Sequence, residues 1–149
     1  MRAVVQRVSR AAIRTEGTLV AEMGAGLLVL VGVAREDGPA QACDLAERLV
    51  HLRIFPDAQG RMNRSLLETG GTLGVVSQFT LMGDARKGRR PAFVAAAPGP
   101  QAEPLVQALV DAARRLGAPV VTGRFGAEMQ IALQNEGPVT ILLDTEHRF

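Results

Sequence analysis

The run Gly26-Leu27-Leu28-Val29-Leu30-Val31 decides the fold that this sequence predicts. Apolar residues follow one another here without polar alternation, which is typical of a strand buried on both faces of a sheet. Residues 73–79 form a second run of the same kind. Between the two runs, the pair Gly38-Pro39 opens a helix, because proline is tolerated at the first helical position. Together these elements predict an α/β fold.

Amphipathic strands and a second helix complete the expected order of elements. Glu16-Gly17 and residues 56–60 are turn-forming stretches that separate strands. The second helix begins at Pro104 and ends at Gly117. We expect strands over residues 2–7, 11–15, 18–23, 27–31, 53–55, 73–79, 128–133 and 139–143. The inward stripes of the two helices are Ala42, Leu45, Ala46, Leu49 and Val50, and then Leu105, Val106, Leu109, Val110, Ala113 and Leu116.

No linker, repeat or low-complexity block divides the 149 residues, a length that is common for one domain. Hydrophobic residues make up 47% of the chain, and Trp and Tyr are absent. The core is therefore expected to consist of Val, Leu, Ile and Ala. The fold class predicted is α/β: a single-domain layered sandwich over residues 1–149, with mixed and antiparallel sheets and two main helices on one face.

The sequence argues against secretion and against a membrane protein. No apolar stretch reaches the roughly 18 residues of a membrane span, and residues 1–7 are too polar for a signal peptide. Cys43 is the single cysteine, so no internal disulfide forms, which fits a reducing cytoplasm. We expect the Cys43 thiol to be buried on the inner side of the first helix.

Several common types of catalytic or cofactor site lack support. Gly24-Ala25-Gly26 begins like a dinucleotide fingerprint, but it lacks the third glycine and precedes a strand instead of a helix. His51 and His147 do not have the spacing of a zinc site. No local motif supports a Ser–His–Asp triad. We therefore expect no metal or cofactor, and a chemistry that depends on positioning and backbone hydrogen bonds.

Positive charge is concentrated in one loop. The formal net charge is only +2, which does not by itself indicate nucleic-acid binding. Arg86, Lys87, Arg89 and Arg90, however, lie within five positions of a glycine-containing segment. Such a run is either a solvated loop or a grip for the phosphates of an RNA or nucleotide.

Polar side chains follow the second buried strand at the point where it ends. Ser77, Gln78 and Thr80 surround Phe79 there, and ligands of α/β folds tend to lie at this end of a strand. Backbone amides that leave the ladder at this point can stabilise an oxyanion. The alternative is that these side chains satisfy local backbone groups. Thr80 could act as a nucleophile, but no adjacent base is evident.

The stretch Asn135-Glu136-Gly137-Pro138-Val139-Thr140 interrupts two strand-like runs. Proline has no amide donor and breaks a strand ladder, so the Gly-Pro pair should form a tight, exposed bend. The carbonyls of Gly137 and Pro138 would then be free to hold an ammonium group. An ordinary hairpin turn is the alternative.

Val76-Ser77-Gln78-Phe79-Thr80-Leu81 and Asn135-Glu136-Gly137-Pro138-Val139-Thr140 together resemble the D-aminoacyl-tRNA deacylase family. The resemblance extends over nearly the whole chain, and two positions depart from it. Ala92 stands where the family usually has serine, and Glu136 where it often has aspartate. The further matching segments are residues 1–8, 26–32, 53–55, 62–66, 87–91 and 122–129.

The resemblance implies a fold like that of the family and a cytoplasmic hydrolase, a homodimer that cleaves the ester between a D-amino acid and the 3′ end of tRNA. It also implies activity on glycine mischarged to alanine tRNA. The Gly137–Pro138 peptide would be cis and would enter the partner's active site to face Ser77, Gln78, Phe79 and Thr80. D side chains would then point to solvent, whereas L side chains would strike the Gly-Pro backbone.

The resemblance further suggests that the 2′-hydroxyl of the terminal ribose assists hydrolysis. Thr80 as covalent nucleophile is the minority version, and near-complete loss of activity in folded Thr80→Val would favour it. Met129 either packs against the terminal adenine or belongs to the core. Arg7 would brace the Gly-Pro bend, and unaltered selectivity in Arg7→Ala would count against that role.

Two other function classes remain open at this point. A non-catalytic dimeric RNA-binding module would use the basic loop, although the chain has no Trp or Tyr and only five Phe for base stacking. A small-molecule esterase would use Ser77 as nucleophile and would need His51 or His147 nearby.

Overall fold

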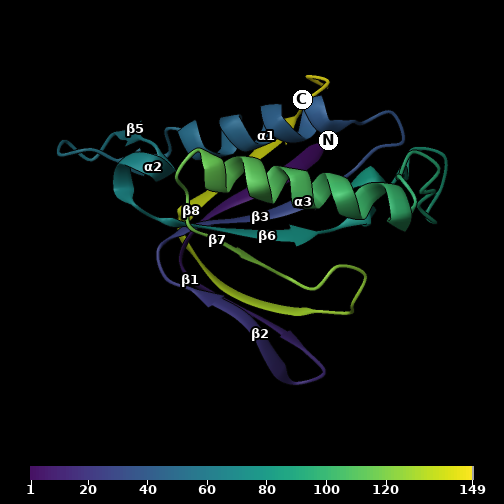
Figure 1. Ribbon diagram of the computed structural model, residues 1–149, viewed down its shortest axis with the longest axis horizontal. Helices are drawn as coiled ribbons and strands as arrows, with labels where there is room; N and C mark the ends of the chain where they lie inside the picture. Colours follow the sequence, from purple (N-terminus) through teal and green to yellow (C-terminus); the bar gives the residue numbers. More distant parts are fainter. Residues whose placement is uncertain (149) are drawn as a thin grey trace.

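The computed structural model describes residues 1–148 and has a six-stranded mixed sheet with helices packed on one face (Figure 1). The strand order is β2-β1-β3-β6-β7, and β8 pairs with the other edge of β1. This agrees with the α/β fold class predicted from the sequence. The strands of this sheet are β1 Arg2–Thr15, β2 Thr18–Met23, β3 Gly26–Gly32, β6 Thr72–Ser77, β7 Val120–Thr122 and β8 Gln130–Asp144. A separate two-stranded sheet contains β4 Phe55–Pro56 and β5 Met62–Arg64.

The first strand is longer than predicted. The two expected strands at residues 2–7 and 11–15 are one strand, β1, whose first half pairs with β3 and whose second half pairs with β2. The prediction of two strands was wrong because the polar residues Ser9 and Arg10 resemble a break, yet β8 pairs with β1 on both sides of them. The Glu16-Gly17 turn is confirmed, and both of its residues have positive φ.

The two buried runs lie side by side as parallel strands β3 and β6, and β7 extends the parallel part. The second run ends earlier than predicted: β6 stops at Ser77, and residues 79–82 form the 3₁₀ helix η1 (Phe79–Met82). The β3 ladder ends at the pair Val31–Ser77. Beyond it, the chain has no strand to pair with and turns.

Helices α1 (Pro39–His51) and α3 (Gly99–Arg115) cover one face of the sheet, as predicted (Figure 1). Their stripes and the facing side chains of β1, β3 and β6 form the main hydrophobic core. The short helix α2 (Leu66–Thr69) begins at Ser65, whose hydroxyl accepts a hydrogen bond from the Glu68 amide. This is an N-cap that stabilises the first turn.

Three details of the helices differ from the predictions. Helix α3 begins at Gly99 and not at Pro104, because the Pro98 carbonyl already accepts hydrogen bonds from Gln101 and Ala102. Leu116, at the end of that helix, is 40% exposed. Cys43 is exposed and not buried. It lies about 100° around the helix from Ala42, outside the buried stripe.

A second, smaller core lies on the other face of the sheet. It contains Val8, Ile13, Met23 and Leu28, and side chains of β7 and β8 pack against it. Strand β2 contacts β7, so the sheet curls around this core. In Figure 1 this half extends below β3 and β6, away from the helices.

The chain passes the Gly-Pro pair without reversing its direction. Strand β8 runs antiparallel to β1 both before and after the pair. Gln6 is opposite Thr140, but Val8 is opposite Asn135, so residues 136–139 form a bulge without partners in β1. The predicted bend between two separate strands, and the alternative hairpin turn, are therefore both replaced by a bulge within one strand.

Candidate functional site

A pocket of about 370 Å³ lies at the end of β6, under the first turn of α3. The four predicted strand-end residues Ser77, Gln78, Phe79 and Thr80 all line it. The rest of the wall is mostly apolar, which is usual for a small-molecule site with a few polar groups. It consists of Val31, Val33, Ala97, Gly99, Ala102, Val106, Phe125, Gly126, Ala127 and Met129.

The turn into η1 sets the geometry of the polar end of this pocket. The Gln78 amide donates to the Val31 carbonyl at 2.7 Å, which is the last hydrogen bond to β3. The amides of Phe79 and Thr80 are the first of η1 and have no acceptor inside that helix. Gln78 Nε2 donates to Thr80 Oγ1 at 2.9 Å. The pocket therefore offers amide donors next to a hydroxyl, without a charged group among its lining residues.

Met129 takes part in both environments between which the sequence left a choice. It lines the pocket, and it also packs against the second core. A Cβ placed on Gly123 would lie 2.7 Å from Met129 Sδ, so Gly123 leaves room for this side chain. Met129 thus packs against the second core and also lines the pocket.

The Asn135 side chain closes the Gly-Pro bulge from within. Val139 N donates to Asn135 Oδ1 at 2.7 Å, and Asn135 Nδ2 donates to the Val139 carbonyl at 3.0 Å. The side-chain amide thereby replaces two ladder bonds that the bulge lacks. Gly137 and Pro138 are exposed at its tip, and the peptide bond between them is cis, as the resemblance implied.

Arg7 fastens the bulge from the neighbouring strand. Arg7 Nε donates to the Glu136 carbonyl at 2.9 Å, and Nη1 donates to the Ile54 carbonyl at 2.5 Å. One guanidinium thus links β1, the bulge and the segment before β4. The sequence pointed to Arg7, but it gave no sign of Ile54 or of the Asn135 side chain as the other parts of this support.

The bulge and the pocket are far apart within one chain. Arg7, beside the bulge, pairs with Leu27 of β3, and Leu27 pairs with Leu73 of β6. The bulge therefore lies at the height of Leu73 along the sheet. Ser77 lies four residues further along β6, about 13 Å at 3.3 Å per residue. Two strands also stand between β8 and β6, which adds three spacings of about 4.8 Å across the sheet. No residue of β8 lines the pocket in the part of the chain that the structure describes.

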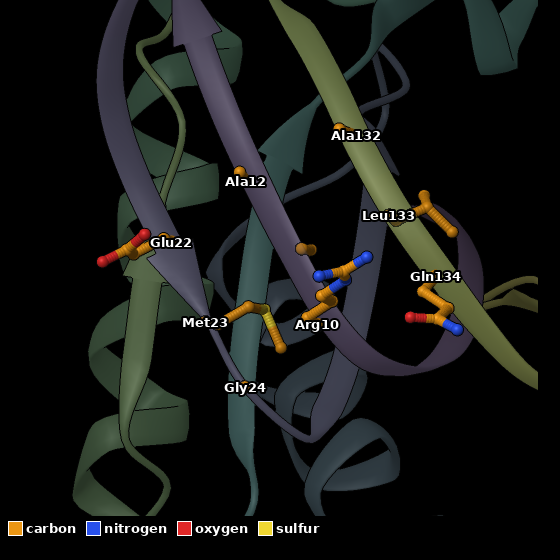
Figure 2. A pocket seen from close by; sticks show the side chains of 9 residues that line it. Arg10, Ala12, Glu22, Met23, Gly24, Ala132, Leu133 and Gln134 are labelled. Carbon is orange, nitrogen blue, oxygen red and sulfur yellow. The ribbon is translucent and has the colours of Figure 1, made fainter.

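A larger hollow of about 820 Å³ lies against β1, β2 and β8 (Figure 2). Figure 2 shows Arg10, Met23 and Gln134 around it, on three neighbouring strands. None of the predicted site residues lines this hollow. The four predicted strand-end residues line the smaller pocket instead, and we therefore place the candidate active site at the end of β6.

The histidines do not belong to the pocket. His51 is exposed at the end of α1, and His147 contacts Arg48 through its Nε2 atom at 3.1 Å. Neither lines the pocket that contains Ser77, so a Ser77 esterase has no base in place. Residues 1–148 contain no group of three or more potential metal ligands. Over the same residues, no helix is long and apolar enough to cross a membrane.

Nine of the fourteen residues that line the pocket were not predicted as site residues. Phe125, Gly126 and Ala127 form a turn that the sequence suggested only as a matching segment without a role. Gly99 and Ala102 were missed because α3 was expected to begin later. The glycine-rich sequence Thr122-Gly123-Arg124-Phe125-Gly126 was the available signal for a loop that borders a ligand.

Comparison with protein families and curated proteins gives a consistent result. Residues 4–144 match the family model described as D-Tyr-tRNA(Tyr) deacylase. The chain is 56% identical over 145 residues to a D-aminoacyl-tRNA deacylase of Thermomicrobium roseum, covering 97% of this chain and 94% of that protein. It is also 56% identical over 149 residues to a D-aminoacyl-tRNA deacylase of Anaeromyxobacter dehalogenans, covering 100% of both chains.

Solved structures give the same fold. A structure titled "c-Myc DNA Unwinding Element Binding Protein" superposes with a TM-score of 0.93 at 36% identity, covering 97% of this chain and 99% of that one. A probable eukaryotic D-amino acid tRNA deacylase has a TM-score of 0.80 at 19% identity, covering 95% and 97%. The second likeness concerns the fold alone.

Proposed function

Because the chain belongs to the D-aminoacyl-tRNA deacylase family, we propose that it is a hydrolase that cleaves the ester bond of D-aminoacyl-tRNA at the end of β6. The products are the free D-amino acid and tRNA. The terminal adenosine would occupy the apolar pocket, with Met129 as one of its walls. The reacting ester would lie at the polar end, beside Ser77, Gln78, Phe79 and Thr80.

The active site is complete only in a homodimer in this proposal. Selection by Gly137 and Pro138 requires their carbonyls to reach the ester, yet the distance between bulge and pocket in one chain is too large for a single amino acid to bridge. A second copy related by a two-fold axis would bring its bulge to the first chain's pocket and receive the first chain's bulge in return. The exposure of the bulge supports this arrangement.

Chirality is then read by the backbone. The carbonyls of Gly137 and Pro138 hold the α-ammonium group, and the amides of Phe79 and Thr80 hold the ester carbonyl. With these two groups fixed, a D side chain points to solvent and an L side chain collides with the Gly-Pro backbone. Any D side chain is accepted, because nothing reads its chemistry. Glycine has no side chain to collide, so glycyl-tRNA mischarged on alanine tRNA is also a substrate.

Hydrolysis proceeds through an oxyanion that the strand-end amides stabilise, since such donors act where charge develops in the transition state. Water attacks the ester carbon, and the 3′-oxygen of the ribose leaves with a proton. The adjacent 2′-hydroxyl of the RNA assists this proton transfer. The Thr80 hydroxyl, whose hydrogen-bond partner is Gln78 and not a base, serves in positioning and not as the nucleophile.

The observation that carries the proposal is the convergence, at the end of β6, of the free amides of Phe79 and Thr80, a small apolar pocket and the family-like segment Val76–Leu81. We expect the protein to hydrolyse D-aminoacyl-tRNA at least about 10²-fold faster than the matched L-aminoacyl-tRNA. The collision of an L side chain with the bulge would displace the ester, and a displacement of about 1 Å lowers the rate by a factor of this order. Time courses of ester cleavage with the two enantiomers of one amino acid on one tRNA measure the ratio. Equal, slow turnover of both would contradict the proposal.

A further inference from the structure

The segment between η1 and α3 contains a loop with a fixed base. Asp84 and Ala92 exchange two backbone hydrogen bonds, Asp84 N to Ala92 O at 2.8 Å and Ala92 N to Asp84 O at 2.9 Å. Residues 85–91 protrude from this closed base, and all of them are exposed. Gly88, with a φ of +152°, lies at the middle of this protruding part. We call residues 84–92 the basic arm.

The charges of the basic arm are of two kinds. Arg86 is committed to Asp84: its Nη2 lies 2.6 Å from Oδ2 and its Nε 2.8 Å from Oδ1. These hydrogen bonds hold the pKa of the Asp84 carboxyl well below its usual value. Lys87, Arg89 and Arg90 have no ion-pair partner among residues 1–148. Three cations are thus held together on a protruding loop, fully available to a ligand.

The base of the basic arm touches the wall of the active-site pocket. Phe93, which follows the arm, packs edge-on against Phe79 with ring centroids 5.2 Å apart. Gly83, which precedes it, donates its amide to the Thr80 carbonyl at 3.0 Å. A Cβ on Gly83 would lie 3.0 Å from the Phe93 ring, so this junction is closely packed. Both ends of the arm are therefore anchored on pocket residues.

We propose that the basic arm grips the sugar–phosphate backbone of the RNA next to the nucleotide in the pocket. This inference rests on the proposed function and adds to it the binding site for the upstream part of the substrate. Lys87, Arg89 and Arg90 pair with phosphates, and Arg86, tied to Asp84, stiffens the arm. The protruding part has positive side chains and no aromatic residue. It is therefore suited to bind phosphates and does not recognise the identity of the bases.

The arm is long enough for this role. Seven protruding residues that go out and return reach about 10 Å from the base, at roughly 3.3 Å per residue. Four of the chain's 17 Lys and Arg residues lie in five consecutive positions of the arm, residues 86–90. The whole molecule, in contrast, carries a net charge of only +2. The local field therefore orients an RNA end toward the pocket, although the protein as a whole attracts it weakly.

The test removes the three available charges and leaves Arg86 in place. The variant carries Lys87→Gln, Arg89→Gln and Arg90→Gln, and the matched control carries Arg61→Gln, Arg114→Gln and Arg115→Gln, three exposed arginines outside the arm. Both are assayed with D-aminoacyl-tRNA and with D-aminoacyl-adenosine, a substrate that has the ester and the base but no phosphate. KM and kcat are measured from 50 to 300 mM salt.

We expect the arm variant to raise KM for the tRNA roughly ten- to a hundredfold at low salt and to leave kcat unchanged. Its slope of log KM against log salt should fall by about 2, because each lost phosphate contact removes about 0.7–0.9. The control and the adenosine substrate should show neither change. An arm variant with the KM and salt slope of the wild type would overturn the inference, while hydrolysis of neither substrate by the wild type would instead overturn the proposed function.

Discussion

Gly137→Ala is expected to lower kcat/KM for D-aminoacyl-tRNA by about 10²-fold while the protein stays folded. Gly137 has a φ of +144°, a conformation that side chains rarely adopt. An added Cβ would lie 2.6 Å from Val139 Cγ2, 2.9 Å from Val139 N and 3.2 Å from an Arg7 nitrogen. The bulge must therefore shift, and a shift near 1 Å at a positioning group costs a factor of this order.

The bulge interrupts the ladder between β1 and β8 already, so its displacement should cost little stability. We expect the melting temperature to remain within a few degrees of the wild type. Gly60→Ala is the matched control, because Gly60 also has positive φ, at +76°, but an added Cβ would meet nothing within 4 Å. An unchanged rate and D/L ratio in Gly137→Ala would show that the bulge is not part of the site.

Ala127→Trp is expected to abolish deacylation by filling the pocket from its turn. Ala127 lines the pocket together with the strand-end residues, and its amide donates to the Arg124 carbonyl in a turn. An indole there would fill much of the 370 Å³ pocket that we propose for the terminal nucleotide. We expect kcat/KM to fall by at least roughly 10²-fold, since the ester no longer reaches the amides of Phe79 and Thr80.

Ala40→Trp makes the same substitution at an exposed position of α1 and should leave the rate unchanged. The two variants are compared by kinetics with D-aminoacyl-tRNA and by circular dichroism to confirm folding. Full activity in folded Ala127→Trp would place the reaction outside this pocket, for example at the hollow between β1, β2 and β8.

The buried elements were the most predictable part of the fold. The run from Gly26 to Val31 and the stripe of the first helix are apolar on every inward position, and both lie where the sequence placed them. The boundaries that failed depend on partners. β6 ends at Ser77 because β3 ends beside it, and β1 continues through Ser9 and Arg10 because β8 pairs with both of its halves.

Cys43 shows the limit of reading a helical stripe from composition. The thiol is apolar and adjacent to Ala42 in sequence, but the 3.6-residue period turns it away from the core. Its exposure was therefore decided by geometry and not by hydrophobicity.

The parts of the candidate site that lie within one short segment were predictable from the sequence. The parts that depend on packing between distant segments were not. The strand end at Ser77–Thr80 and the Gly137–Pro138 pair are short motifs with a direct physical interpretation. The pocket wall at Gly99, Ala102 and Ala127 depends on how α3 and the turn after β7 pack on β6. The bulge itself was mistaken for a bend, because a single sequence does not reveal that β1 pairs with β8 on both sides of it.

The central claim is that the pocket of one subunit works with the Gly-Pro bulge of the other. The most direct test is a heterodimer purified through two different C-terminal tags, with Gly137→Ala in one chain and Ala127→Trp in the other. A second heterodimer pairs the wild-type chain with a chain that carries both substitutions. The two assemblies contain the same substitutions and differ only in how these are distributed.

If the site is shared between subunits, the first heterodimer has one intact site and should deacylate D-aminoacyl-tRNA at about half the wild-type rate, as two-fold symmetry requires. The second heterodimer should then be inactive. The reverse result, an inactive first heterodimer and a half-active second one, would mean that pocket and bulge act within a single chain and would contradict the account.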